Sequence, residues 1–150
     1  MSGLFRREGA ASGFTMDIQH ALIVILLGAV LADKIEGEEE MMFVRHLMAK
    51  SPIFERNTDR MDKRILEACR TRIHGDPGVV QEAARFLPEA LRETAFAMSL
   101  EIVFADGVVN RGERDFIHML ARQLDIDTDL AAPMIKTFAA LYRGYQPEVA

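Results

Sequence analysis

The sequence contains little cysteine and no excess of basic residues. Cys69 is its one cysteine in 150 residues, so no disulfide can form within the chain. This cysteine usage fits a reducing compartment, and we expect a cytoplasmic protein. Lys and Arg together number 18 against 23 Asp and Glu, which gives a formal net charge of -5. Nucleic-acid-binding surfaces normally need clustered Lys and Arg, so we expect no nucleic acid partner.

Long hydrophobic runs are also missing. The most apolar stretch, residues 21–32, is shorter than the roughly 20 residues that a helix needs to cross a bilayer, and Asp33 follows it directly. Asp17 precedes the stretch, and no small-residue cleavage site follows it, which argues against a signal peptide. The pattern favours a buried core helix.

Most recognisable catalytic patterns are absent. There is no glycine-rich phosphate loop and no nucleophile elbow, and His20, His46 and His74 lack the spacing of zinc ligands. Asp115 and His118 are three residues apart, as in one half of a carboxylate-bridged metal site, but such a site needs further Glu residues from other helices. A metal-dependent enzyme built on this pair would need an inward-facing pocket. We expect a protein without enzymatic activity and keep this enzyme as an alternative.

Nearly every apolar run repeats at helical spacing, and no segment alternates as a strand does. We therefore predict an all-α fold of about seven helices in a single domain, residues 15–144, with a flexible N-terminal arm, 1–14, and a C-terminal tail, 145–150. The predicted helices run from 15 or 17 to 32, 37 to 50, 58 or 59 to about 74, 78 to 86, 89 to 104, 110 to 124, and 127–129 to about 144.

One helix–turn–helix pattern occurs twice. A shift of 73 residues places Asp33 on Asp106 and Glu40 on Glu113. The register continues into the flanking helices, as the following pairs show: Leu27 and Leu100, Val30 and Val103, Phe43 and Phe116, Val44 and Ile117, Leu47 and Leu120. The repeat predicts two pseudo-symmetric helical hairpins packed together, each with an acidic turn.

The acidic turns have two interpretations. In the structural one, Gly107 takes the left-handed conformation, and Asn110 with Glu113 forms a capping box at the start of the next helix. In the functional one, Asp33, Glu40, Asp106 and Glu113 supply oxygen ligands to a divalent cation, with Ca²⁺ or Mg²⁺ favoured over Zn²⁺. The turns are not EF-hands, because Ile35 and Val108 occupy the third loop position, where an oxygen ligand is needed.

The two A-D-x-φ-x-x-x-x-E turns (φ, apolar) and the stretch L-P-E-A-L-R-E-T-A-F-A-M-S-L-E-I-V-F-A-D-G resemble the TerB tellurite-resistance family. The resemblance covers roughly residues 17–142. It implies a seven-helix domain with internal pseudo-symmetry, found in cytoplasmic bacterial proteins of stress and tellurite-resistance operons. A similar domain is attached to membrane-anchored J-domain co-chaperones. Carried onto this chain, the family's proposed divalent-metal positions are Asp33, Glu40, Asp106 and Glu113.

These observations support two hypotheses. The first is a TerB-like module that binds a protein partner, with a divalent cation at the acidic turns controlling that binding. The second is a purely structural duplication, in which the acids cap helices and a helix face serves as a scaffold without metal. The sequence leaves open homo-oligomer formation and peripheral membrane association through a partner.

Overall fold

A computed structural model describes residues 13–32 and 37–144 of the chain. Within these ranges the protein consists of seven α-helices and two short 3₁₀ turns, without a strand, so the prediction of an all-α fold is confirmed. The helices are α2 (Ile18–Ala32), α3 (Glu38–Lys50), α4 (Asp59–Gly75), α5 (Val79–Phe86), α6 (Arg92–Phe104), α7 (Arg111–Gln123) and α8 (Thr128–Leu141), and the 3₁₀ turns are η1 (Pro52–Phe54) and η2 (Glu89–Leu91).

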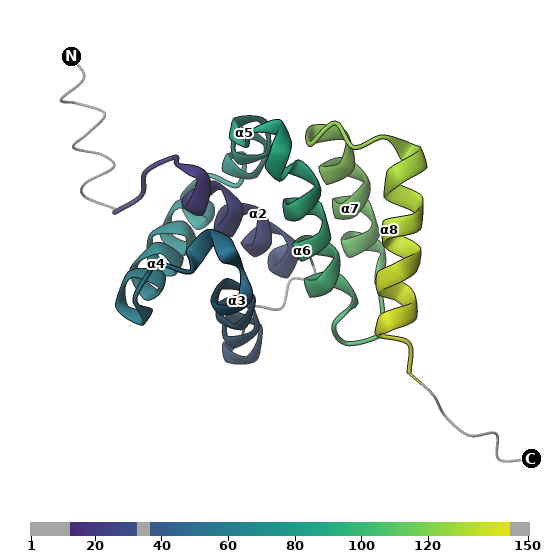
Figure 1. The fold of residues 1–150 in the computed structure, drawn as a ribbon, viewed down its shortest axis with the longest axis horizontal. Helices are drawn as coiled ribbons and strands as arrows, with labels where there is room; N and C mark the ends of the chain where they lie inside the picture. Colours follow the sequence, from purple (N-terminus) through teal and green to yellow (C-terminus); the bar gives the residue numbers. More distant parts are fainter. Residues whose placement is uncertain (1–12, 33–36, 145–150) are drawn as a thin grey trace, which may run out of the picture.

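Helix α2 forms the centre of the molecule (Figure 1). Its residues 21–30 are all buried, because α4, α5, α6 and α7 each pack against it. This burial explains why the segment is apolar on every side rather than along one stripe. None of the helices in the described ranges is long and apolar enough to span a membrane.

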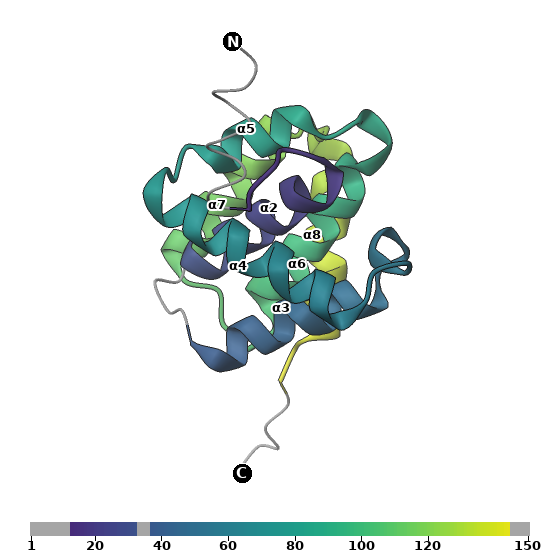
Figure 2. The same ribbon diagram turned by 90° about the vertical axis from the view of Figure 1, so that its left-hand side faces the viewer.

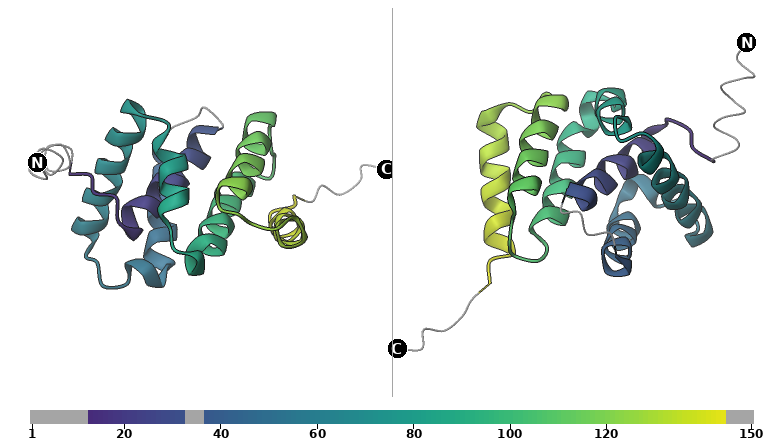
Figure 3. Two further views of the ribbon diagram at one scale, coloured as in Figure 1. Left: turned by 90° about the horizontal axis from the view of Figure 1, so that it is seen from above. Right: turned by 180° about the vertical axis from the view of Figure 1, so that it is seen from behind.

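The remaining helices surround α2. Helices α6, α7 and α8 lie side by side, with α8 at the outer edge (Figure 1 and Figure 3). Helix α4 crosses in front of α2 in Figure 2 and lies on the side of the molecule opposite α8. Helix α8 packs mainly against α6, and of its residues only Ala131 is fully buried. The core therefore lies around α2, and α8 covers one flank of it.

The predicted helix boundaries differ from the structure at three places. The helix predicted from Glu89 begins as the 3₁₀ turn η2, and α6 proper starts at Arg92, because Pro88 holds extended backbone before a tight first turn. The turn η1 after Ser51 was not predicted; the Ser51 hydroxyl accepts a hydrogen bond from the Ile53 amide there. The last helix ends at Leu141 rather than near residue 144.

Phe14, at the end of the predicted N-terminal arm, is well packed. Phe14 is buried, its ring meets the His20 ring edge to face at 5.5 Å, and the Arg72 guanidinium lies 5.4 Å from its centre. Such a contact anchors the chain just before α2. The rest of the predicted arm, residues 1–12, and the predicted tail, 145–150, lie outside the described residues.

The two predicted hairpins are formed by α2 with α3 and by α6 with α7. Their matched apolar positions share the same environment: Leu27 and Leu100, Val30 and Val103, Val44 and Ile117, and Leu47 and Leu120 are all buried. The α2–α6, α2–α7 and α3–α6 pairs are in contact, so the hairpins pack against each other as predicted. A pseudo-symmetry axis between them stays a prediction.

Candidate functional site

The second acidic turn joins α6 to α7 and has the cap geometry that its sequence predicts. Gly107 has a φ of +81°, a left-handed conformation that glycine adopts without strain, and its amide donates to the Phe104 carbonyl at 2.9 Å. The Asp106 carboxylate accepts a hydrogen bond from the Val108 amide at 3.0 Å, which closes the turn locally. Asp106 itself remains exposed to solvent.

Helix α7 begins with a complete capping box. The Glu113 amide donates to Asn110 Oδ1 at 2.8 Å, and the Asn110 amide donates to Glu113 Oε1 at 3.0 Å. Glu113 is only 4% exposed, so these bonds hold a carboxylate at the edge of the core. The structural interpretation of this turn is confirmed, because two otherwise unpaired amides at the helix start are satisfied.

The first acidic turn lacks such a cap. Helix α3 starts after Gly37, which has no side-chain oxygen to accept from the first amides. The Glu40 carboxylate bends back over this residue: its Oε2 lies 2.8 Å from the position that a Cβ on Gly37 would occupy. Asp33, the remaining predicted site residue, lies outside the described residues, so its place in a site stays a sequence prediction.

The ends of the two hairpins meet closely. The carbonyl oxygen of Ala32, at the end of α2, lies 2.6 Å from the position that a Cβ on Gly112 would occupy in the first turn of α7. Only glycine permits this approach of two backbones. The close contact places the end of α2, in the first hairpin, beside the capping box of α7, in the second.

Three of the four predicted site residues line one pocket, which we call the acidic pocket. It has a volume of about 240 Å³ and lies between α2, α3, α6 and α7. Its lining consists of Ala29, Val30, Glu39, Glu40, Phe43, Ile102, Ala105, Asp106 and Glu113. The repeat brings Glu40 and Glu113 together at this pocket, although they are 73 residues apart in the chain.

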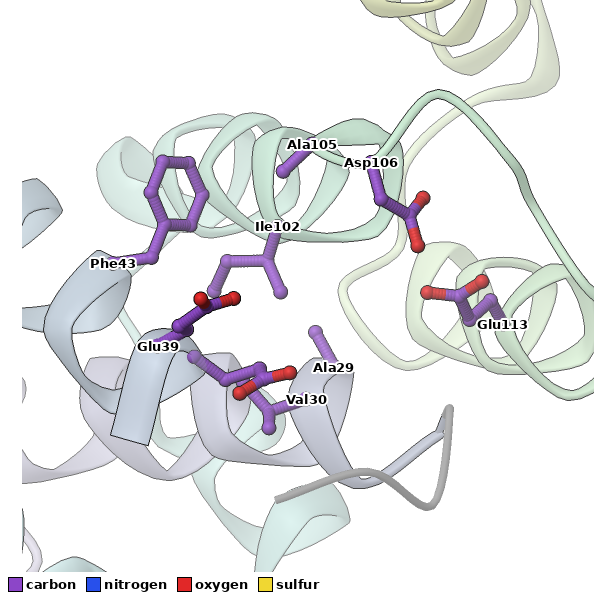
Figure 4. Close-up of a pocket in the computed structure, with 9 residues that line it drawn as sticks. Ala29, Val30, Glu39, Phe43, Ile102, Ala105, Asp106 and Glu113 are labelled. Carbon is purple, nitrogen blue, oxygen red and sulfur yellow. The ribbon is translucent and has the colours of Figure 1, made fainter. Parts of the chain in front are cut away.

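The pocket has an acidic side and an apolar wall. Figure 4 shows the Asp106 and Glu113 carboxylates pointing toward each other, with Glu39 on the opposite side beside Phe43. No basic residue is present among the described residues that line the pocket. Converging carboxylates repel one another, and a nearby positive charge or open solvent relieves that repulsion.

The described side chains by themselves do not form a metal site. Within residues 13–32 and 37–144, no three His, Cys, Asp or Glu side chains gather into a group that could hold a metal ion. The alternative enzyme needs Asp115 and His118 to face an inward pocket, whereas both residues are exposed on α7. Turning outward is natural for this pair, since α7 buries Ile117 and Leu120 on its opposite face.

Sequence reasoning left out two members of the acidic pocket that matter for its chemistry. Glu39 adds a fourth carboxylate to the lining, and Ile102 contributes to the apolar wall. The signal for Glu39 was its place beside Glu40 in the acidic run before α3. The sequence did not indicate Ile102, because the repeat aligns it with Ala29. The two side chains differ in size and branching, so this pair does not stand out in the repeat.

The fold defines an all-helical protein in which two hairpins meet at an acidic pocket. When the chain is compared with family models, curated proteins and solved structures, nothing matches.

Proposed function

We propose that this chain is a non-enzymatic, TerB-like interaction module whose acidic pocket binds a divalent cation, Ca²⁺ or Mg²⁺, to control a protein partner. The observation that carries the proposal is the shared pocket of Glu40, Asp106 and Glu113. Hard cations prefer such carboxylate oxygens, and Glu39 lies in the same lining. Asp33 adds a further candidate ligand from sequence. The module acts in the cytoplasm.

The cation would connect the two hairpins. Asp106 lies at the end of α6, Glu113 at the start of α7, and Glu39 and Glu40 in the first turn of α3. Within the described residues these carboxylates are not grouped for coordination, and in this proposal the start of α3 moves toward the second turn when the ion binds. Ion binding thereby changes the position of α3 relative to α6. A partner that binds one of the two arrangements more tightly then responds to the ion.

Capping without metal is the second candidate. It is favoured by the capping box of Asn110 and Glu113, which accounts for one carboxylate without any ion. In this candidate the acidic pocket is solvated, and partner binding depends only on exposed helix faces. The two candidates differ in whether ions change the free energy of unfolding.

The test is thermal unfolding of metal-stripped protein with Ca²⁺, Mg²⁺, Mn²⁺ and Zn²⁺ added in turn. An ion that binds only the folded state stabilises it, by about 2.7 kcal/mol at a concentration 100 times its Kd. We expect a rise with Ca²⁺ or Mg²⁺ that is lost in a Glu40→Gln, Asp106→Asn double variant. The matched control is Glu55→Gln with Asp115→Asn, which removes the same charge from exposed positions. If no ion changes the unfolding temperature, the acidic turns serve only as helix caps.

The proposed cellular role is tellurite resistance or a related bacterial stress response, and it is supported by the sequence resemblance alone. Growth of a strain lacking this protein, with and without tellurite, tests it directly. Complementation with the double variant at Glu40 and Asp106 then asks whether the acidic pocket matters in the cell. Equal growth of all strains under tellurite would remove this stress from the proposal.

A further inference from the structure

A second hollow of the surface lies on the side of the molecule opposite α8, between α4 and the segment that leads into α2. We call it the α4 groove. Its volume is about 910 Å³, and it is lined by Gly13, Asp17, Gln19, His20, Arg60, Met61, Lys63, Arg64, Ile65, Glu67, Ala68 and Thr71. None of these residues lines the acidic pocket, so the two sites are separate.

The helix that forms most of this groove is strongly two-sided. Ile65, Leu66, Cys69 and Ile73 face the core, while Arg60, Lys63 and Arg64 are exposed. Spacings of three and four residues put these three basic side chains on one face of α4, directly at the groove. A chain with an overall charge of -5 thus carries a concentrated positive strip.

The two carboxylates of the groove contact side chains other than the three basic ones. Asp17 Oδ1 lies 2.8 Å from His20 Nδ1, and Glu67 Oε1 lies 3.2 Å from Arg70 Nη1. Each acid therefore has a neighbouring partner of its own. In contrast, Arg60, Lys63 and Arg64 make no ion pair with any described residue.

An apolar floor accompanies the charges. Met61 is 46% exposed, and the buried Ile65 and Ala68 line the groove below it. A methionine side chain is flexible and polarisable, so it adapts to apolar groups of different shape. No Phe, Tyr or Trp lines the groove, so stacking platforms for single-stranded nucleic acid are missing from its described lining.

We propose that the α4 groove docks an acidic peptide segment of a protein partner. The segment's carboxylates lie against Arg60, Lys63 and Arg64, and an apolar side chain of the segment packs on Met61. Charge complementarity selects this occupant, and the concave floor fits a peptide better than a flat lipid surface. The inference rests on the proposed role as an interaction module but not on the proposed cation.

The experiment uses the full chain and a fluorescein-labelled peptide that alternates paired glutamates with single leucines. Fluorescence anisotropy measures its binding, and a peptide with glutamine in place of every glutamate is the charge control. We expect the acidic peptide to bind and its affinity to fall with added salt. The glutamine peptide should bind at least about tenfold more weakly, because its contacts to the basic strip lack charge.

Two matched variants locate the site. Lys63→Glu with Arg64→Glu reverses two charges in the groove, whereas Arg122→Glu with Lys136→Glu reverses two exposed charges on α7 and α8. All four positions are exposed, so both proteins should fold, which circular dichroism checks. We expect a loss of about tenfold or more in peptide affinity for the first variant and less than about twofold for the second. Met61→Ser should weaken the acidic peptide without changing the salt dependence.

Equal binding to wild type and both variants, or no charge-dependent binding at all, would overturn the proposal. Vesicles of phosphatidylcholine with phosphatidylserine provide a separate arm. Binding to these vesicles that disappears with the Lys63 and Arg64 reversal, without peptide binding, would make the strip a lipid contact and also overturn the proposal. The metal titration of the acidic pocket is a different readout, so failure of either idea is recognised separately.

Discussion

The two hairpins share a sequence pattern but differ in what surrounds them. In the first, α2 is buried over residues 21–30, whereas in the second, α6 buries only Ala95, Phe96, Ser99, Leu100 and Val103. The reason is coverage: α3, α4, α5, α6 and α7 all pack against α2, while α6 has one side toward α8 at the edge of the molecule. The two hairpins thus bury matched positions where they contact each other, while their other faces have different neighbours.

The turns differ in a corresponding way. The second has a left-handed Gly107 and a full capping box at Asn110 and Glu113. The first begins its helix after Gly37 without a side-chain cap. Local hydrogen bonds close the second turn, whereas Gly37 gives α3 no side-chain cap. In the proposed function, the start of α3 is the part that moves toward a cation.

The largest expected change in stability concerns the face at which the two hairpins contact each other. Leu27→Ala and Leu100→Ala remove matched side chains that are 2% and 0% exposed. Each should lower the free energy of unfolding by about 2–5 kcal/mol, through lost burial and the cavity left behind. Urea unfolding measures both, with Leu141→Ala, at a 65% exposed position, as the control that should change little. A loss at only one of the two leucines would mean that the hairpins do not share the core equally.

The next largest effect concerns the close approach of the two hairpins. Gly112→Ala would place a Cβ 2.6 Å from the Ala32 carbonyl oxygen, a backbone atom that cannot rotate away. We expect a loss of about 1–3 kcal/mol in stability, as in other overpacked sites. Chemical denaturation measures the loss, and Gly75→Ala, where nothing lies within 4 Å, is the control. An unchanged midpoint for Gly112→Ala would show that the hairpin ends separate without cost.

A cap exchange tests the difference between the turns. Asn110→Ala should destabilise the protein by about 1 kcal/mol, because the Glu113 amide loses its acceptor. Gly37→Asn should stabilise it by a few tenths of a kcal/mol by giving α3 the side-chain cap that it lacks. The new side chain meets the far end of the Glu40 side chain, which shifts more easily than backbone does. Differential scanning calorimetry compares both variants; a loss of stability in Gly37→Asn would mean that Glu40 itself serves as the cap.

The last test concerns a hydrogen bond that ties α6, in the second hairpin, to the residue after α8. Tyr142 Oη donates to Glu101 Oε1 at 2.8 Å, whereas the repeat position of Glu101 in the first hairpin is Gly28. Burial, followed by this hydrogen bond and the Glu101 charge, raises the pKa of Tyr142 to about 12 from 10.0. A raised pKa means that the folded state favours the protonated hydroxyl. The stabilisation is therefore complete below pH 10 and is lost as the pH rises through about 12.

Tyr142→Phe should accordingly cost about 0.5–1 kcal/mol near neutral pH. Its difference from wild type should shrink between pH 10 and about 12. Urea unfolding of both proteins at matched pH values measures that difference, in which the titration of other residues cancels. A difference that stays constant across this range would show that the hydroxyl does not bind Glu101 in solution.

Sequence reasoning predicted the helices because their signals are local. The apolar segment of α2, the cap at Asn110 and the proline before η2 each act over a few residues, and each was read correctly or within a turn. The acidic pocket was predicted in part, since the repeat aligned Glu40 with Glu113. Its apolar wall and the α4 groove depend on which helices become neighbours. Which helices become neighbours is decided by packing between segments far apart in the chain. The periodicity within one segment does not indicate its neighbours.

The lone cysteine gives the molecule an internal reporter of its own opening. Cys69 is fully buried, its thiol donates to the His20 carbonyl at 3.5 Å, and burial, with the Asp17 charge adding to it, raises the pKa of its thiol far above the ordinary value. Thiol reagents should therefore modify wild-type protein only when α4 separates from α2. The rate of labelling measures that opening, and a cysteine introduced on any exposed helix can be labelled selectively while Cys69 stays silent.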